Sequence, residues 1–363
     1  MGKIFRNLFL LIALIIFLLT SSASCSLFAQ GVPRSAKPAD ANHFLFGAND
    51  SIYSISANGS NLKILLGRMV HREKKNSVIT QVGLPALSPD RKTIAYAKGE
   101  TSYSLTSSIP KVSEKIPEIW LMDATGKNRR KLTTVDKQSM TGEEDVSSLQ
   151  WSPDGKLLYC ERSTTFFSVD MNGNKTESTG WLPSSGINMV ICPDGRHVAF
   201  LEWRGITLAK IDKMLVSDPN YIFSEALFSD KGLGGTFGGA DLAWQSEKDL
   251  LFIETRYAAS SQKGNTGTNP ATKYPESYYI NRINIESRAV SGLYTTSPGD
   301  EIGDIEVSPT QTLVAFLYGN KEKRGTDTAK WPKPWTIDLR NGSASSVPLP
   351  KEAATWRFDD LSW

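Results

Sequence analysis

The chain has 363 residues, of which 40% are hydrophobic and 22% are charged, with 28 glycines and 18 prolines. These are values of a folded globular protein with many turns, and they exclude an intrinsically disordered chain. The formal net charge of +3, from 41 basic and 38 acidic residues, is too small for the concentrated basic surface that nucleic-acid binding requires, so we expect no nucleic-acid partner.

The first thirty residues have the pattern of an export signal. Lys3 and Arg6 precede an apolar run from Leu8 to Leu19, and small residues follow it. The run is about twelve residues long, shorter than the roughly 20 residues of a membrane-spanning helix. We therefore predict an exported protein of the periplasm or cell envelope, with an uncleaved membrane anchor as the alternative. The predicted parts are a signal peptide or lipoprotein signal at 1–30, a linker at 31–42 and a folded domain at 43–363.

Cys25 is a candidate lipidation site, because it lies six residues beyond the apolar run. The preceding Ser22-Ala23-Ser24 matches a lipoprotein signal only in part, since an apolar residue is expected at position 22. Cleavage after Ala23 or Ala29 by an ordinary signal peptidase is the alternative. A lipid on Cys25 is the only membrane contact that we predict.

An internal repeat dominates the rest of the chain. In each copy a polar turn separates an apolar residue from an alternating apolar run, which predicts two strands joined by a tight hairpin. A second hairpin follows with Asn-Gly or Thr-Gly at its turn, as at Asn172-Gly173, because glycine supplies the positive φ that such turns need. Each copy therefore encodes four antiparallel strands, a to d from the inside outwards. The copies are ALSPDRKTIAYAKG from Ala86, QWSPDGKLLYCERS from Gln150, VICPDGRHVAFLEW from Val190, LAWQSEKDLLFIET from Leu242 and EVSPTQTLVAFLYG from Glu306.

The two ends of the repeat region complete each other. Residues 43–66 encode strands b, c and d without a strand a, and residues 357–363 encode a strand a that stops where its hairpin should begin. One blade made from both ends would close a ring and leave no unpaired sheet edge. With five internal repeats this predicts an all-β fold, a six-bladed β-propeller closed by the C-terminal strand, with seven blades as the alternative. We also expect the chain to be complete.

The repeat resembles that of a known family. The segment QWSPDGKLLY from Gln150 and the segment IWLMDATGKNRRKLT from Ile119 are similar to the repeat of the TolB-like (WD40-like) β-propellers. The resemblance covers about residues 43 to 363 and implies a propeller in the cell envelope, with partner binding by analogy. The α/β domain that precedes the propeller of TolB itself has no counterpart in residues 31–42.

Motifs for chemistry are missing from the sequence. No G-x-S-x-G occurs, which excludes a serine peptidase of the α/β-hydrolase type. Some TolB-like propellers are lyases with metal-bound histidines, but His197 occupies an ordinary strand position and His71 a charged loop. We expect no catalytic residue, no metal and no other cofactor. Cys160 and Cys192 lack metal or redox spacing and are predicted to be free buried thiols, with a bridge between neighbouring blades as the alternative.

Long connections gather on one face of the predicted propeller. The b–c insertions at 99–117, 256–277 and 319–334 are long, and so are the d–a connections after blades one and four, whereas the a–b and c–d turns are short. Long loops are often functional, so this face is the predicted partner surface, with solvated loops as the alternative. Its candidate binding residues are Tyr257, Tyr274, Lys321, Arg324, Trp331 and Trp335.

Three aspartates stand at the entry of strand a in successive blades. They are Asp241, Asp304 and Asp360, each three residues before the Trp or its equivalent. Adjacent carboxylates at the mouth of the channel could hold a cation or the basic terminus of a partner, and capping of local turns is the alternative. The sequence therefore predicts a monomeric, non-enzymatic binding or scaffold protein that recognises a protein or peptide, with a glycan also open. The rival is a polysaccharide lyase or hydrolase with its site in the channel.

Overall fold

The structure is a computed structural model. It describes residues 43–72, 76–104, 111–135, 146, 148–162, 165–177, 189–202, 205–214, 225–229, 241–256, 277–320, 332–351, 353, 356 and 358–363. The predicted signal peptide, the linker and Cys25 lie outside these residues. Within the described part, no helix combines the length and apolarity needed to cross a membrane.

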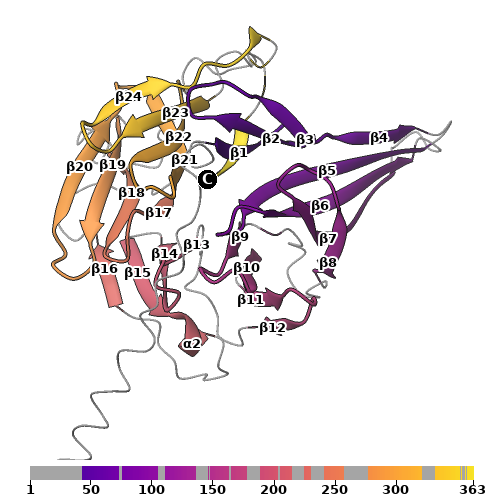
Figure 1. Cartoon of the computed structure of the whole chain (residues 1–363), viewed down its shortest axis with the longest axis horizontal. Coiled ribbons are helices and arrows are strands. Elements are labelled where there is room, and N and C mark those ends of the chain that lie inside the picture. Colours follow the sequence, from indigo (N-terminus) through magenta and orange to yellow (C-terminus); the bar gives the residue numbers. More distant parts are fainter. Residues whose placement is uncertain are drawn as a thin grey trace, which may run out of the picture. The chain divides into compact units, whose positions relative to one another are not determined.

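Six antiparallel sheets form a ring within the compact unit from Pro38 to Trp363 (Figure 1). Five sheets have four strands and one has five. The protein is a six-bladed β-propeller, as the repeat predicts, and the alternative of seven blades is wrong. The innermost strands of neighbouring blades contact one another around the centre of the ring, where the C-terminus also lies.

The strands follow the predicted a-to-d order in every blade, except that in blade two an additional strand, β4, pairs beside strand a. In sheet order they are β25 (Phe358–Ser362), β1 (His43–Ala48), β2 (Ser51–Ser56) and β3 (Lys63–Leu66) in blade one; β4 (Met69–Arg72), β5 (Asn76–Leu87), β6 (Thr93–Ser104), β7 (Lys111–Asp123) and β8 (Arg130–Thr134) in blade two; β9 (Ser148–Trp151), β10 (Leu157–Arg162), β11 (Thr165–Asp170) and β12 (Lys175–Glu177) in blade three; β13 (Met189–Ile191), β14 (His197–Glu202), β15 (Gly205–Lys210) and β16 (Glu225–Ser229) in blade four; β17 (Leu242–Trp244), β18 (Asp249–Arg256), β19 (Ser277–Asn284) and β20 (Val290–Thr295) in blade five; and β21 (Asp300–Val307), β22 (Leu313–Asn320), β23 (Lys333–Asp338) and β24 (Ser343–Ser346) in blade six. One short helix, α2 (Ile211–Met214), follows β15.

Blade one is built from both ends of the repeat region, as predicted. The strand β1 pairs with β2 on one side and with β25 on the other, where Leu45 lies opposite Ser362. Aromatic side chains from the two ends pack together in the core of the blade. The ring of Phe44 lies 5.5 Å from that of Trp363, and the ring of Phe46 lies 5.1 Å from that of Phe358.

Hydrogen bonds explain the Ser-Pro-Asp-Gly turns between strands a and b. In blade three the hydroxyl of Ser152 donates to Asp154 Oδ1 over 2.7 Å and accepts the N–H of Leu157 over 2.9 Å. Ser88 makes the same two bonds in blade two, with Asp90 and Thr93. In these two copies of the repeat the side chains therefore satisfy backbone groups within the turn, which favours this local structure.

The second turn of a blade packs against the preceding blade. Gly126 has a φ of 83°, and a Cβ built on it would lie 2.5 Å from the carbonyl oxygen of Leu65 in blade one. Gly173 approaches Leu132 of blade two in the same way. The sequence explains these glycines by the positive φ of the turn. The structure shows that the lack of a side chain is also needed for close contact between blades.

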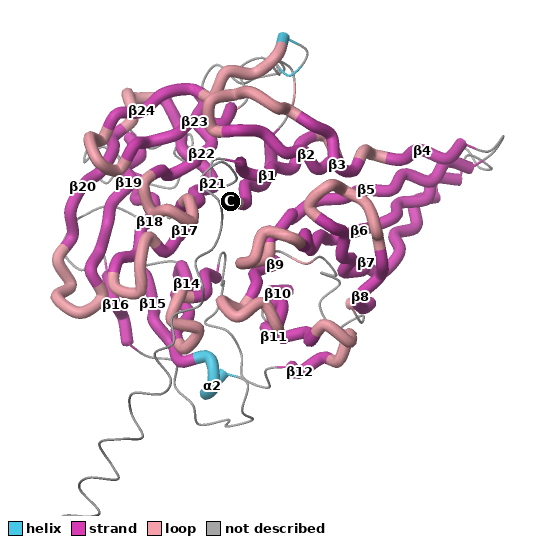
Figure 2. The backbone as a smooth tube through the Cα atoms, viewed as in Figure 1, coloured by secondary structure: helices cyan, strands magenta, loops and turns pink. Residues whose placement is uncertain are grey.

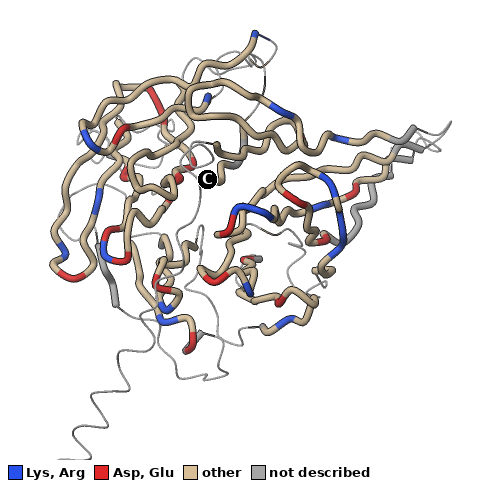
Figure 3. Tube along the Cα trace, in the orientation of Figure 1, with Lys and Arg blue, Asp and Glu red and all other residues tan. Residues whose placement is uncertain are grey.

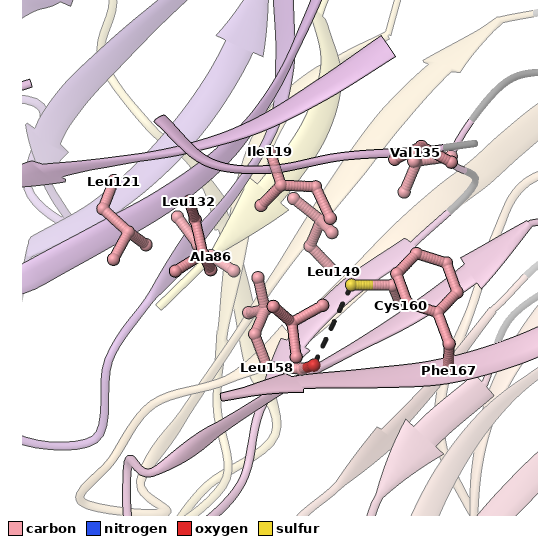
Figure 4. Packing of buried hydrophobic residues seen from close by; sticks show 12 residues of the cluster. Ala86, Ile119, Leu121, Leu132, Val135, Leu149, Leu158, Cys160 and Phe167 are labelled. Carbon is pink, nitrogen blue, oxygen red and sulfur yellow. Dashed lines mark hydrogen bonds between the residues drawn. The ribbon is translucent and has the colours of Figure 1, made fainter. Parts of the chain in front are cut away.

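Buried apolar side chains fill the space between blades. Between blades two and three, Ala86, Ile119 and Leu121 pack with Leu149 and Leu158 (Figure 4). The cluster also contains the thiol of Cys160, which lies 3.9 Å from the carbonyl oxygen of Leu158. Cys160 and Cys192 are both buried and free, as predicted, so the alternative of a bridge between them is wrong.

Blade two differs from the prediction, because strands replace two long loops. The strands β6 and β7 stay paired as far as Ser104 and Lys111, through the segment predicted to be a loop at 99–117. The preceding connection forms β4 and the first part of β5, so His71 lies in a strand and not in a loop. We call this part the blade-two extension: β4 with residues 76–83, 98–104 and 111–117. Pairing satisfies the backbone groups that a loop would leave to water, and Figure 2 shows the extension pointing away from the ring.

Blade four also departs from the expected short turns. Its c–d connection runs from Ile211 to residue 224 and begins with α2. Ile211 is buried in the core of the blade, which anchors this helix. Of the other predicted insertions, at 256–277 and 319–334, residues 257–276 and 321–331 lie outside the described residues, as does the glycine-rich connection at 230–240.

Candidate functional site

The b–c hairpins and d–a connections meet at one face of the propeller, which we call the loop face. A cavity of about 310 Å³ opens on this face between blades one and two. Its volume is at the lower end of the range for small-ligand pockets. Every lining residue belongs to a b–c hairpin or a d–a connection: Gly47, Ala48, Asp50, Gln81, Val82, Gly83, Ala97, Lys98, Gly99, Pro117 and Val146.

The charged groups that line this cavity are held in ion pairs. Lys98 Nζ lies 3.2 Å from Glu100 Oε1 and 4.9 Å from the centre of the Trp120 ring. Asp50 Oδ2 lies 3.4 Å from Arg68 Nη1. The side chain of Lys98 is only 19% exposed, so water screens its pair less than a surface pair. The cavity therefore offers fixed charges of both signs together with the amide of Gln81.

A second group of loop-face side chains lies between blades five and six. Tyr294, Tyr318 and Trp335 are half-buried near the ends of β20, β22 and β23, and we call them the blade-six aromatic cluster. The rings of Tyr318 and Trp335 lie 4.7 Å apart, and those of Tyr294 and Tyr318 lie 6.5 Å apart. The hydroxyl of Tyr318 donates to Asp300 Oδ2 over 2.5 Å.

The hydroxyl of Tyr318 is held in its protonated form. Burial, followed by the hydrogen bond and the charge of Asp300, raises the pKa of Tyr318 well above its ordinary value. Burial and the charge of Asp300 also raise the pKa of Tyr294. Both phenols therefore suit hydrogen bonding and stacking better than proton abstraction.

Trp335 is the one predicted aromatic residue whose surroundings can be described. It belongs to the blade-six aromatic cluster and packs on Phe316. Sequence reasoning missed Tyr318 and Lys98, because each lies in a strand and not in a predicted loop. The remaining candidates lie outside the described residues: Tyr257, Tyr274, Lys321, Arg324 and Trp331.

Asp241 and Asp304 join neighbouring blades. Asp241 Oδ1 accepts the N–H of Leu242 over 2.8 Å, and its Oδ2 accepts the N–H of Ile305 in blade six over 2.6 Å. Asp304 Oδ2 accepts the N–H of Leu361 in blade one. Each carboxylate thus caps the first strand of the next blade, a role that combines local capping with contact between blades.

The third predicted aspartate belongs to blade one. Asp360 lies in β25, and its side chain is outside the described residues. In blade two, which follows blade one, Pro85 occupies the position equivalent to Ile305 and Leu361. Proline has no N–H, so it cannot donate to Asp360 the hydrogen bond that the other two aspartates accept. Across the described ranges, no group of three His, Cys, Asp or Glu side chains is arranged to hold a metal ion.

Glu161 is a further carboxylate at a junction between blades, and sequence reasoning missed it. Its Cα lies opposite Ser148, which occupies in blade three the position of Asp241 in blade five. The side chain is 0% exposed, and neither of its oxygens has a hydrogen bond of normal geometry within the described part of the chain. Burial raises the pKa of Glu161 to about 8, partly offset by the backbone of Met189. Met189 is equivalent in blade four to Ile305 in blade six, whose N–H is bound by Asp241. Glu161 therefore faces the same backbone position of the next blade as Asp241 does, but it does so from strand b instead of strand a.

Comparisons with known proteins show only the fold. No family model matches the chain, and no curated protein matches it. Solved structures that are similar include the hydrazine synthase of Kuenenia stuttgartiensis, with 14% identity, a TM-score of 0.44 and coverage of 73% of this chain and 65% of that one. The oligogalacturonate lyase of Vibrio parahaemolyticus has 10% identity and a TM-score of 0.41, covering 77% of this chain and 62% of that one. The dipeptidyl peptidase 4 of Porphyromonas gingivalis has 8% identity and a TM-score of 0.40, covering 82% and 48%.

This chain spans less than two thirds of each of these three proteins. At such identities and TM-scores, the similarities say nothing about what it binds or does. The resemblance of its repeat to the TolB-like family therefore stays a prediction.

Proposed function

We propose that the protein is a non-enzymatic binding protein of the cell envelope that recognises a protein or peptide through the loop face. The observation that carries this proposal is the presence on one face of both the blade-one to blade-two cavity and the blade-six aromatic cluster. Binding surfaces commonly combine aromatic anchors with a polar surround.

The chemistry of the loop face suits a peptide. Tyr318 and Trp335 offer apolar surface at a low cost in side-chain entropy, because each ring is already fixed by packing. Lys98 and Asp50 supply opposite charges at the cavity, where a peptide terminus or a side chain could exchange with the existing pairs. A glycan would use the same aromatic rings, and it is the second ligand class that this face would accept.

The envelope location and the monomeric state are part of the proposal. The location is supported by the export pattern of residues 1–30 and by the resemblance to the TolB-like repeat. A lipid on Cys25 would add a membrane anchor to the N-terminus.

The proposal is tested by capturing partners from an envelope extract with immobilised protein. Trp335→Ala and Lys98→Ala each alter one part of the loop face, whereas Lys156→Ala alters an exposed a–b turn that lies on the opposite face. We expect the wild type and Lys156→Ala to recover the same partner, and the two loop-face variants to recover at least about tenfold less.

Circular dichroism separates loss of binding from loss of fold, and Trp335→Phe keeps an aromatic ring in place. Equal recovery by all variants, with their folds intact, would contradict the proposal. Recovery lost equally in Lys156→Ala would place the binding surface elsewhere.

A polysaccharide lyase or hydrolase is the second candidate, and one observation favours it. Burial, followed by the charge of Asp241, raises the pKa of Glu306 to about 8. Two nearby carboxylates with different proton affinities can serve as acid and base. Turnover of acidic polysaccharides by the wild type, lost in Glu306→Gln, would establish this function in place of the first.

A further inference from the structure

The strands β3 and β4 are consecutive edge strands of two neighbouring blades, and we call them together the β3–β4 edge. β3 is the outer edge strand of blade one, β4 is the edge strand of blade two that pairs with its strand a (β5), and only Gly67 and Arg68 separate them. Within the described residues, each pairs on one side only, β3 with β2 and β4 with β5. The N–H of Arg68 donates to Ser51 Oγ over 2.9 Å, which holds the connection between the two strands against blade one. An edge strand directs alternate N–H and C=O groups away from its sheet, where another strand can pair with them.

Exposed apolar side chains concentrate on this edge. Among the described residues, four large hydrophobic side chains are exposed, and three of them are Ile64 at 60%, Met69 at 50% and Val70 at 44%. Met69 and Val70 are consecutive, so they lie on opposite faces of β4. The fourth is Val290 at 47%, on the outer strand β20 of blade five. A partner strand along β4 could therefore bury apolar surface on both faces of the sheet.

The same edge is positively charged. Residues 63–72 contain Lys63, Arg68 and Arg72 and no acidic residue, so ten residues carry as much net charge as the whole chain, which is +3. In Figure 3 the coloured trace through β3 and the start of β4 shows blue segments and no red ones. Arg68 also pairs with Asp50, but its side chain stays 43% exposed.

We infer that the β3–β4 edge docks an extended, acidic segment of another protein, which adds to the sheet as a further strand. The unpaired backbone of the edge selects a strand, the exposed apolar residues select alternating apolar side chains, and the basic residues select carboxylates between them. A second copy of this chain is disfavoured as the occupant, because it would bring a like-charged edge against this one.

This inference does not rest on the proposed function. The β3–β4 edge comprises residues 63–72, and the loop-face residues Lys98 and Trp335 are not part of it. Either surface can fail its test while the other passes.

The test uses the full mature protein and a fluorescein-labelled peptide of twelve residues in which Glu and Val alternate. Fluorescence anisotropy should show saturable binding to the wild type that weakens as ionic strength rises. Val70→Glu should lower the affinity at least about tenfold, because it removes apolar contact and adds repulsion. Val290→Glu is the matched control, with the same substitution at a similarly exposed position on another edge strand, and should change the affinity less than about twofold.

Two further peptides examine the mode of binding. A peptide with Lys in place of Glu should bind at least about tenfold more weakly, and so should a peptide N-methylated at alternate residues, because it lacks the N–H groups of one edge. Trp335→Ala should bind the Glu-Val peptide as the wild type does. The inference is overturned if the peptide does not bind at up to about 1 mM, or if Val70→Glu and Val290→Glu weaken binding equally. It is also overturned if the protein dimerises in sedimentation analysis and Val70→Glu abolishes the dimer.

Discussion

Glu161 occupies a position that is apolar in other blades. Alignment of the hairpins places Ala97, Leu201, Ile253 and Leu317 at the corresponding points of strand b. A buried carboxylate without well-formed hydrogen bonds is costly in its charged form, and so it takes up a proton. In blades five and six, Asp241 and Asp304 cap the first strand of the next blade. Blade three has Ser148 at the equivalent position and so lacks this capping aspartate. The carboxylate of Glu161 therefore faces the junction with the next blade from strand b, whereas Asp241 and Asp304 face theirs from the entry of strand a.

Glu161 should make stability depend on pH. Its pKa is raised from 4.5 to about 8, so the folded state keeps a proton that the unfolded chain releases between these values. Its contribution to stability is thus fully present below pH 4.5 and is lost as pH rises to about 8. We expect the free energy of unfolding to fall between pH 5 and pH 8 by up to about 3 kcal/mol more in the wild type than in Glu161→Gln.

Urea denaturation at the two pH values measures this difference. Glu247→Gln, which changes an exposed carboxylate, serves as the control and should keep the slope of the wild type. Identical pH profiles for the wild type and Glu161→Gln would show that the carboxyl group is not buried as described.

At the level of single elements, the turns between strands c and d connect one blade to the next. Gly59, Gly126 and Gly173 all have positive φ, and each approaches a backbone carbonyl oxygen of the preceding blade. Gly342 has a φ of 70° in the equivalent turn of blade six, but nothing lies within 4 Å of a Cβ built there. The same kind of turn thus occurs with and without a contact between blades.

This difference predicts the outcome of alanine substitutions. Gly342→Ala should cost about 1 kcal/mol, which is the strain of a positive φ. Gly126→Ala should cost at least about 2 kcal/mol more, because its Cβ would meet the carbonyl of Leu65 and separate the blades. Thermal and urea unfolding of the two variants measure the costs, and equal losses would refute the role of the contact.

The strands could be predicted from sequence wherever the turn chemistry was local. Ser152, Asp154 and Gly155 specify their hairpin within a few residues, so the blades and their order followed from the repeat. The blade-two extension did not follow, because polar residues such as Ser102 are also common in turns and solvated loops. The role of Asp241 was also hidden, since its partner is the backbone N–H of Ile305, 64 residues away, which leaves no mark on side-chain identity.

At the scale of the whole molecule, the ring depends on one strand pair. Phe358, Leu361 and Trp363 are buried in the core of blade one, and Asp304 reaches the same strand from blade six. Other neighbouring strands within a blade are joined by the chain itself, whereas β25 and β1 meet only through packing and hydrogen bonds. Closure of the propeller is therefore non-covalent.

Removal of residues 358–363 should abolish cooperative unfolding, because it exposes the edge of β1 and opens the core of blade one. A circular permutant can join Trp363 to His43 through Ser-Pro-Asp-Gly-Lys, the turn of blade three, and have its new termini between residues 321 and 331. This permutant should fold as the wild type does. Urea denaturation followed by two spectroscopic probes distinguishes these outcomes. A truncated protein with a wild-type transition would show that β25 is dispensable.

The direction of this strand pair has a mechanical consequence. Because β25 runs antiparallel to β1 and Ser362 lies opposite Leu45, the chain enters β1 and leaves β25 at the same end of the pair. A force applied between these two points would break the hydrogen bonds one after another, as in a zipper, and would not load them all together. A pull on its two ends should therefore open the ring at low force, even where the same contacts keep it folded in solution.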